Sequence, residues 1–322
     1  MKTLITGGAG FIGSHLTSHL MSKGQQVVIL DDFSGTKNTN RNGNKDLGKL
    51  TIIEGSILDQ GLVFSLLADV NYCFHLAASL GVEKINKDPI GCLETNLRGT
   101  EIVLNAAASS GVRTLLASSS EVYGKNPEMP LTEDSDRVLG SPKIARWSYS
   151  EAKAMDELLA FELHKNRSFQ VTIARFFNTV GLRQSGSYGM VLPRFVSAAM
   201  SNKPLIVYGD GKQSRTFCSV SDVVEALFLL MESKESVGQA FNIGSTDEIT
   251  MAELAQKVIK ITNSSSEITY KKHSEVFGDN FEEPHRRLPD ISKITKAIGW
   301  LPKKSLDEVI LEVADNLRAN ET

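Results

Sequence analysis

The most constraining feature of the sequence is a glycine-rich turn that follows its first apolar run. KTLIT predicts a short strand, and TGGAGFIGSHL after it opens a helical pattern. Glycine lets the backbone turn tightly, approach a pyrophosphate and pack the helix against the strand, while the helix N-terminus offers amide donors. The turn therefore predicts a dinucleotide site, and its residues are Gly7, Gly10, Phe11, Ile12 and Gly13.

A carboxylate at the end of the second apolar run indicates which dinucleotide binds. QVVILD ends at Asp31, which can accept hydrogen bonds from an adenosine ribose and would repel a 2′-phosphate. Lys37, in the polar loop at residues 33–49, argues in the opposite direction. The balance predicts NAD rather than NADP.

Short apolar runs alternate with helical patterns through the first half of the chain. The runs are KTLIT, QVVILD, LTIIEG, YCFHLAA and RTLLASS, and VTIARFF and QAFNIG follow later. This alternation is typical of βαβ units and predicts an α/β fold: a Rossmann-type doubly wound parallel sheet with a smaller α/β C-terminal substrate lobe. We expect the cofactor domain at residues 1–178, with 221–245 returning to it, and the lobe at 179–322.

Composition excludes several classes of partner. The net charge of −3 gives no field that would attract nucleic acid or an anionic membrane, and no apolar stretch predicts a membrane span or a signal peptide. Cys73, Cys92 and Cys218 form no C-x-x-C pair, which favours a reducing, cytoplasmic setting. His15 and His19 lack the glutamate of an H-E-x-x-H site, so we expect no metal.

A tyrosine and a lysine lie one turn apart in SYSEAK. Tyr149 and Lys153 are spaced i and i+4, so their side chains share a helix face. An ammonium about 4 Å from a phenol, at an effective dielectric of about 20, favours the phenolate by about 4 kcal/mol, nearly three pKa units. That predicts a base near neutral pH, although Y-x-x-x-K alone is more often an ordinary amphipathic helix surface.

Taken together, TGGAGFIG, HLAA (75–78), Asn96, the serines after RTLLASS and Y-x-x-x-K resemble the extended short-chain dehydrogenase/reductase family, particularly its nucleotide-sugar branch. The resemblance implies NAD as cofactor, a UDP-sugar substrate in the C-terminal lobe and a homodimer. It implies that Tyr149 is the base, that Lys153 holds the tyrosine and the nicotinamide ribose, and that Ser119 binds the sugar hydroxyl being oxidised.

The same resemblance extends to further binding residues. It implies that Ser56, Ile57 and Ala77 line the cofactor site, although an aspartate is common at the position of Ser56. It also assigns Asn178, Arg215 and Arg287 to the UDP group, where guanidinium forks match diphosphate oxygens. Leu182 departs from the proline that is frequent in this branch.

Glu121 in SSSEVYG distinguishes the activities within the branch. Related epimerases carry a small residue there, and 4,6-dehydratases carry an Asp-Glu pair, whereas this chain has Ser120 before Glu121. Ser-Glu resembles the UDP-glucuronate decarboxylases, in which Glu121 would do acid/base work or orient the sugar, with Arg215 and Arg146 as possible carboxylate or enolate partners. The alternatives are a structural Glu121 that accepts backbone amides and an Arg146 that is an ordinary loop residue.

The predicted function is NAD-dependent modification of a nucleotide sugar through transient oxidation at C4. The first hypothesis is a lyase that converts UDP-glucuronate to UDP-xylose or its 4-keto form, with Ser119, Glu121, Tyr149, Lys153 and Arg215 as catalytic residues. The second is a UDP-sugar 4-epimerase, acting on UDP-glucose/galactose or UDP-glucuronate/galacturonate. The third is a non-catalytic NAD-binding scaffold, against which the intact Tyr149 and Lys153 argue.

Overall fold

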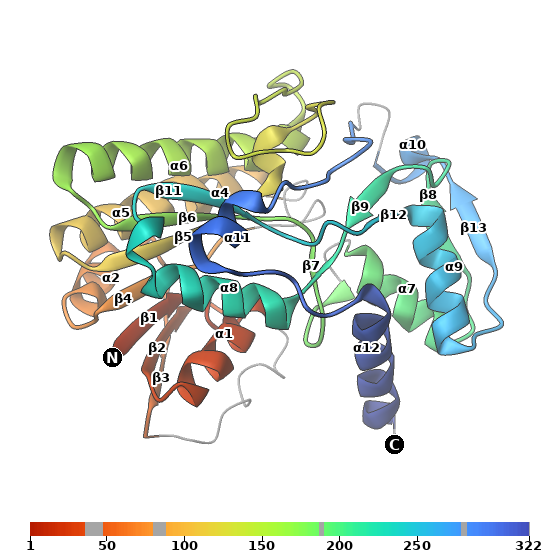
Figure 1. The fold of residues 1–322 in the computed structure, drawn as a ribbon, viewed down its shortest axis with the longest axis horizontal. Helices are drawn as coiled ribbons and strands as arrows, with labels where there is room; N and C mark the ends of the chain where they lie inside the picture. Colours follow the sequence, from red (N-terminus) through yellow and green to blue (C-terminus); the bar gives the residue numbers. More distant parts are fainter. Residues whose placement is uncertain (36–47, 80–87, 187–189, 278–281, 322) are drawn as a thin grey trace.

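The computed structural model of the protein describes residues 1–35, 48–79, 88–186, 190–277 and 282–321. Its centre is a seven-stranded parallel sheet with the order β11-β6-β5-β4-β1-β2-β3 (Figure 1). The strands are β1 (Lys2–Thr6), β2 (Gln26–Asp31), β3 (Leu50–Glu54), β4 (Tyr72–His75), β5 (Arg113–Ser119), β6 (Val171–Phe176) and β11 (Gln239–Ile243). Lys37 and most of the loop predicted at 33–49 lie outside the described residues.

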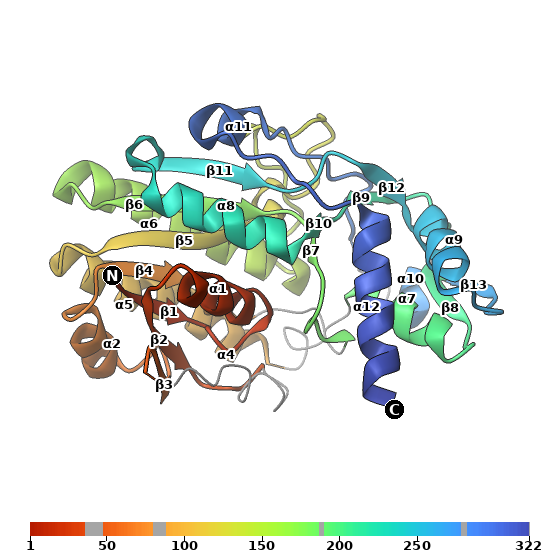
Figure 2. The same ribbon diagram turned by 60° about the horizontal axis from the view of Figure 1, so that its bottom comes forward.

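Helices cover both faces of this sheet, which explains why its inner strands are nearly continuous apolar runs (Figures 1 and 2). On one face pack α1 (Phe11–Ser22), α8 (Val220–Glu232) and α11 (Ser292–Ile298). On the other face pack α2 (Gln60–Leu67), α5 (Thr100–Ser109) and α6 (Ser148–Arg167). The predicted fold class is confirmed.

The strand order reverses between β1 and β4. Thr6, the last residue of β1, has Leu30 as its register partner on one side and His75 on the other. Chain connections leave in opposite directions from these two strands, so a crevice opens at their carboxyl ends. The glycine turn after Thr6 lies at this crevice.

A second packing unit occupies the right of Figure 1. Helices α7 (Val191–Met200), α9 (Met251–Thr262) and α12 (Leu306–Glu321) share an apolar cluster, and β8 (Leu205–Tyr208) pairs in parallel with β13 (Ile268–Lys271). Two shorter pairs are β7 (Thr179–Val180) with β10 (Cys218–Ser219) and β9 (Ser214–Thr216) with β12 (Glu248–Thr250). The remaining elements include α4 (Pro89–Leu93), η2 (Glu94–Gly99), η3 (Ser120–Tyr123), η4 (Ala145–Trp147), η6 (Lys234–Ser236) and α10 (His273–Phe277).

The chain returns from this unit to the central sheet. β11 pairs with β6 through register partners such as Phe241 and Ala174, although α7 and α8 lie between these strands in the sequence. The last strand of the sheet is therefore added after part of the lobe. The division into domains at residue 178 stays a prediction.

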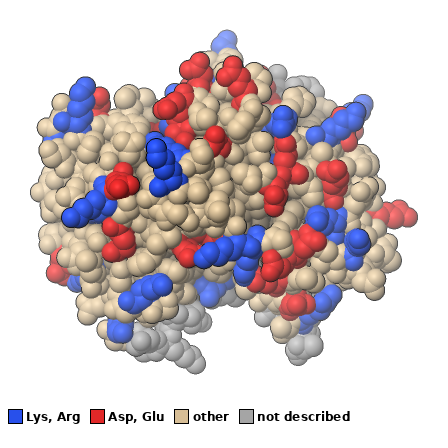
Figure 3. Space-filling view, in the orientation of Figure 1, with Lys and Arg blue, Asp and Glu red and all other residues tan. Residues whose placement is uncertain are grey.

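The surface in Figure 3 shows Lys and Arg side chains interspersed with Asp and Glu over the face in view. Within the described ranges, none of the helices combines the length and apolarity needed to cross a bilayer.

Candidate active site

The glycine turn between β1 and α1 is packed so closely that side chains would not fit. Gly7 has a φ of +72°, and a Cβ added there would lie 2.7 Å from the backbone nitrogen of Ala77. A Cβ on Gly13 would lie 2.2 Å from the Gly7 carbonyl oxygen. The turn thus brings bare backbone and the α1 N-terminus to the crevice, and Gly10 is the N-cap. This cradle fits a dinucleotide pyrophosphate.

Asp31 ties the end of β2 to the same turn. Its side chain accepts hydrogen bonds from the backbone nitrogens of Ala9 (2.9 Å) and Phe33 (2.8 Å). Burial raises the pKa of Asp31, and these backbone hydrogen bonds oppose the rise. A carboxylate oxygen has more than one acceptor position, so the predicted contact with a ribose hydroxyl remains open to it.

The other predicted cofactor residues differ in what their side chains contact. Ser56 uses its hydroxyl to cap its own loop by accepting from Leu58 N (3.1 Å). Ile57 is buried against the position of Gly99. Phe11 and Ile12 are partly buried and pack on the cluster beneath α1. Their roles toward NAD stay predictions.

Tyr149 and Lys153, the predicted catalytic pair, lie at the beginning of α6. Lys153 is buried with its Nζ 3.3 Å from Asp156 Oδ2. Tyr149 is held near Glu121, because Ser150 Oγ donates to the Glu121 carbonyl oxygen (2.7 Å). Ser119, at the end of β5, accepts from the Glu121 backbone nitrogen (3.2 Å). The two segments that carry Ser119 and Tyr149 are therefore fastened together through Glu121.

The electrostatics of Tyr149 differ from the expectation. Burial raises the pKa of Tyr149, the Lys153 ammonium opposes that rise, and the charges of Glu121 and Asp156 add to it, so the pKa lies above its ordinary value. The prediction that Lys153 alone would give a phenolate near neutral pH was wrong for the protein without ligands. It left out the desolvation of the phenol and two carboxylates.

Glu121 lies between two arginines. Its Oε1 accepts from Arg287 Nη1 (2.6 Å) and Arg146 Nη2 (3.1 Å), and its Oε2 lies 2.9 Å from Arg146 Nη1. Burial by itself would raise the pKa of Glu121, but Arg287 and Arg146 outweigh it and hold the pKa well below its usual range. Glu121 is thus a fixed anion, which argues against a role as proton donor.

Two alternatives from the sequence are wrong at this point. The partners of the Glu121 side chain are guanidinium groups, not backbone amides. Arg146 is a partly buried member of the cluster, not an ordinary loop residue. The signal that could have found it is its place three residues before Tyr149, which brings it to the N-terminus of α6.

Arg215 and Arg287 are both buried. Arg215 donates to the side chain of Glu283 (2.7 Å), the Ser214 carbonyl (2.7 Å) and the His285 carbonyl (3.3 Å). Burial, and next the charge of Arg287, lower the pKa of Arg215 to about 10. Sequence reasoning missed Glu283, which lies in a stretch with no periodic pattern.

Several buried donors of the cluster lack a protein partner. Arg287 Nε, Arg287 Nη2 and Arg146 Nε have no hydrogen-bond acceptor among the described residues. A buried donor left unpaired costs about 1–3 kcal/mol, so these groups are available to an anionic ligand. Asn178 is used differently, because its side chain donates to the Thr216 carbonyl (2.9 Å) and so attaches the link between β6 and β7 to β9.

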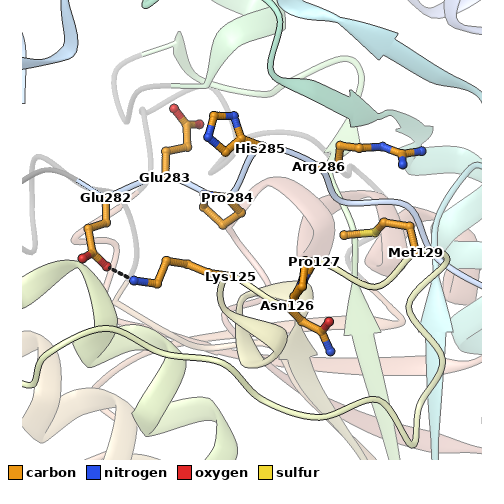
Figure 4. Close-up of a pocket in the computed structure, with 9 residues that line it drawn as sticks. All are labelled: Lys125, Asn126, Pro127, Met129, Glu282, Glu283, Pro284, His285 and Arg286. Atoms are coloured by element: carbon orange, nitrogen blue, oxygen red, sulfur yellow. Dashed lines mark hydrogen bonds and ion pairs between the residues drawn. The ribbon is translucent and has the colours of Figure 1, made fainter.

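A pocket of about 390 Å³ borders the segment that precedes Arg287. Its walls are residues 125–127 and 129 on one side and residues 282–286 on the other (Figure 4). Lys125 points across it to Glu282 (2.7 Å), which also accepts from Trp147 Nε1 (3.0 Å). The segment leading to Arg287 is thereby attached to the residue that precedes α6.

Comparisons with known proteins agree with this geometry. Residues 4–313 match the family described as GDP-mannose 4,6 dehydratase. The UDP-N-acetyl-alpha-D-glucosaminuronate decarboxylase of Bacillus cytotoxicus is 40% identical over 97% of this chain and 96% of its own length. The UDP-glucuronic acid decarboxylase 1 of Arabidopsis thaliana is 36% identical over 99% of this chain and 70% of its own length.

Solved structures of similar proteins cover the whole fold. The UDP-glucuronic acid 4-epimerase of Bacillus cereus, in complex with UDP-glucuronic acid and NAD, has a TM-score of 0.88 and 28% identity, covering 99% of this chain and 100% of that one. The dTDP-glucose 4,6-dehydratase DesIV of Streptomyces venezuelae, with NAD bound, has a TM-score of 0.89 and 27% identity, covering 100% and 98%.

Proposed function

Because the chain belongs to the GDP-mannose 4,6-dehydratase family, within the extended short-chain dehydrogenases/reductases, we propose that it is an NAD-dependent decarboxylase of a UDP-linked hexuronic acid. The observation that supports this most is the Glu121 cluster. A fixed carboxylate held by Arg146 and Arg287 lies beside the Tyr149 helix, and Ser120 occupies the place of a second acid.

The first step that we assign to the chain is removal of a proton. Tyr149 takes the proton of the sugar C4 hydroxyl, Ser119 orients that hydroxyl, and the Lys153 ammonium stabilises the phenolate. Bound NAD supplies the hydride acceptor. Because burial and two carboxylates oppose ionisation of Tyr149, the cationic Lys153 is essential to this step.

The second step is loss of carbon dioxide. A ketone at C4 makes the C6 carboxylate a β-keto acid. The C5–C6 bond breaks, its electron pair forms a double bond between C4 and C5, and the π pair of the ketone moves onto the C4 oxygen. The resulting enolate needs positive charge and hydrogen-bond donors, not an acid. Arg146 and Arg287 have buried donors without partners, which supports a role beside the substrate's anionic groups. A water molecule then supplies the proton to C5. A pentose would form if the hydride returned from the cofactor to C4, and otherwise the 4-keto pentose would be the product.

Elimination at C6, the reaction of a 4,6-dehydratase, is less compatible with this site. Protonating a departing hydroxyl needs a carboxylic acid, whereas the pKa of Glu121 is held well below its usual range. Ser120 is buried and has no acidic proton to offer at neutral pH. The UDP group would lie toward Arg215, whose guanidinium suits a diphosphate oxygen.

Two substrates follow from the relatives. The Bacillus cytotoxicus protein is named for the 2-acetamido sugar and the Arabidopsis proteins for UDP-glucuronate. Incubation of the purified protein and NAD with each uronate, and separately with UDP-glucose, followed by NMR of the products, distinguishes them. Release of carbon dioxide with a pentose product supports the proposal. Inversion at C4 with all carbons retained would instead establish the 4-epimerase, which the Bacillus cereus structure keeps as the alternative.

We also propose a cytoplasmic homodimer. Met155 and Leu158 on α6 are 55% and 53% exposed, and Ile90 and Leu97 on the neighbouring α4 and η2 are exposed apolar residues as well. An apolar helix face of this kind is typical of a subunit contact. Free thiols at all three cysteines support a reducing compartment.

A further inference from the structure

Helix α6 carries two buried carboxylates beyond the proposed catalytic pair. Asp156 and Glu157 are 3% and 5% exposed, and buried charges are costly unless they are paired. Glu157 is paired, because Arg175 donates to both of its oxygens and Ser118 Oγ donates to Oε1. Asp156 is paired as well, but its charged partner is Lys153, a member of the proposed catalytic pair.

Asp156 and Lys153 form a buried ion pair within α6. Lys153 Nζ lies 3.3 Å from Asp156 Oδ2, and the two side chains are 2% and 3% exposed. The second partner of Asp156 is the hydroxyl of Thr100, the first residue of α5. Thr100 is itself completely buried. Asp156 therefore holds the ammonium in a region closed to solvent.

From Thr100 the hydrogen bonds continue to the glycine turn. His75 Nε2 lies 3.0 Å from Thr100 Oγ1, His75 Nδ1 lies 2.7 Å from Thr6 Oγ1, and Thr6 Oγ1 accepts from Ala77 N (3.3 Å). Burial, and next the charge of Lys153, lower the pKa of His75 to about 3, so the ring is neutral.

Ala77, Thr6, His75, Thr100 and Asp156 thus form one row of neighbouring polar groups. Counting donors and acceptors assigns which group donates to which. The Thr100 hydroxyl stabilises the Asp156 carboxylate and lowers its pKa, so we assign it as the donor to Asp156. With that assignment it accepts from His75 Nε2–H, and the Thr6 hydroxyl donates to His75 Nδ1. Every hydrogen bond points the same way, from the Ala77 amide toward Asp156. The row ends on a carboxylate that also receives the Lys153 ammonium.

We propose that Asp156 is the positioning residue of the catalytic pair, and that the hydrogen-bonded row which it ends couples Lys153 to the cofactor-binding turn. The inference rests on the proposed roles of Tyr149 and Lys153. Without Asp156, the flexible lysine side chain would lose its only partner of opposite charge in direct contact among the described residues. With it, the ammonium stays in one place whether or not the tyrosine is ionised.

The proposal also has an electrostatic consequence. The charged and titratable groups that face the pair are Asp156 and Glu157 on α6, Glu121 on η3 and the neutral His75 on β4. Burial would lower the pKa of Lys153, but Asp156 and then Tyr149 outweigh it and raise it. The charge of Asp156 also raises the pKa of Tyr149. Asp156 thus keeps the lysine charged and in place, and it also raises the pKa of the tyrosine.

The test is an absorbance titration of Tyr149 in the complete protein without substrate, taken as the difference from Tyr149→Phe. In a Lys153→Met background, Asp156→Asn should lower the midpoint by about one pH unit, since only a neighbouring negative charge is removed. With Lys153 present the fall should be smaller, because the released ammonium stabilises the phenolate less. Glu162→Gln removes a charge from an exposed position of the same helix and should leave the midpoint unchanged. Equal falls with and without Lys153 would overturn the positioning role, and an equal shift in Glu162→Gln would overturn the electrostatic role.

A second pair of variants tests the row if Asp156→Asn does not fold. Thr100→Val should weaken binding of NAD several-fold, because it cuts the connection to the glycine turn, and Thr100→Ser should restore it. Equal affinities in Thr100→Val and the parent protein would overturn the coupling. Failure of the parent protein to turn over any UDP-uronate would refute the proposed function alone, because neither measurement uses turnover.

Discussion

Arg287 Nη1 and Glu121 Oε1 are separated by 166 residues in the sequence and by 2.6 Å in the structure. Glu121 belongs to the turn after β5, whereas Arg287 lies on the segment between α10 and α11. This contact joins the carboxyl end of the inner strand β5 to the chain returning from the lobe. The fixed charge of Glu121 therefore depends on both halves of the protein.

Replacing Glu121 should impair decarboxylation more than oxidation. In Glu121→Gln, Arg146 and Arg287 lose their anionic partner, and carbon dioxide release should fall on the order of ten-fold or more while the initial reduction of NAD falls less. Single-turnover absorbance of reduced nicotinamide, compared with trapped carbon dioxide, measures the two steps. Glu151→Gln, which loses an exposed ion pair with Arg137, is the control. Equal losses in both steps would contradict the role proposed for Glu121.

Removing the phenol hydroxyl should abolish the first step while leaving the fold intact. Tyr149→Phe should reduce NAD at least about a hundred-fold more slowly, because no other group is assigned to take the C4 proton. Binding of the UDP-sugar, measured by calorimetry, should change little, since the arginines are untouched. Retention of full activity would favour the alternative in which Y-x-x-x-K is only a helix surface.

The glycine turn should not tolerate a methyl group. A Cβ at position 13 would lie 2.2 Å from the Gly7 carbonyl oxygen, so Gly13→Ala should lower the free energy of unfolding by about 1–3 kcal/mol and weaken NAD binding. Gly61→Ala in α2 is the matched control, because the nearest atom to its Cβ would be 3.6 Å away. Urea unfolding and NAD titration measure both effects. Similar behaviour of the two variants would refute the close packing.

His75 should make the folded protein sensitive to acid. Its pKa is lowered to about 3 by burial and the Lys153 charge, so the unfolded chain binds the proton first and stability is lost as pH falls from about 6.5 toward 3. For the group alone, the loss between about pH 7 and about pH 5 is about 2 kcal/mol. In His75→Gln, the free energy of unfolding measured with urea should differ between about pH 7 and about pH 5 by about 2 kcal/mol less than in the parent protein. An unchanged difference would show that the ring does not stay neutral in the fold.

The exposed face of α6 should control assembly. Leu158→Glu should convert a dimer into monomers, because it puts a charge at the centre of the proposed contact. Leu301→Glu changes a residue of equal exposure, 53%, away from this helix and should stay dimeric. Sedimentation over a range of protein concentrations measures both. A monomeric parent protein at every concentration would refute the dimer.

The sheet and the family were predictable because their signals are local. A glycine turn after a strand and seven short apolar runs each occupy a few consecutive residues, and all seven runs became strands of the sheet. The predicted membership of the extended short-chain family is confirmed. Arg215 and Arg287 could be named from the resemblance, although their roles stay predictions.

The arrangement of charges could not be derived in the same way. The roles of Arg146 and Glu283 depend on partners on other elements, and the role of Asp156 depends on its burial beside Lys153 of the same helix. Hydrophobic periodicity reports neither. Asp156 lies in a helix with many charged residues, where the sequence alone predicts exposure. The pKa of Tyr149 was misjudged for a related reason, because a single neighbouring charge was weighed without the burial that opposes it.

The late position of β11 in the sequence has a consequence for biosynthesis. While the nascent polypeptide leaves the ribosome, β6 has an uncovered hydrogen-bonding edge until β11, which follows α7 and α8, has emerged. Exposed strand edges are sites of intermolecular pairing. Translation that pauses or terminates before residue 239 would therefore yield aggregation-prone fragments, whereas release after β11 completes the edge.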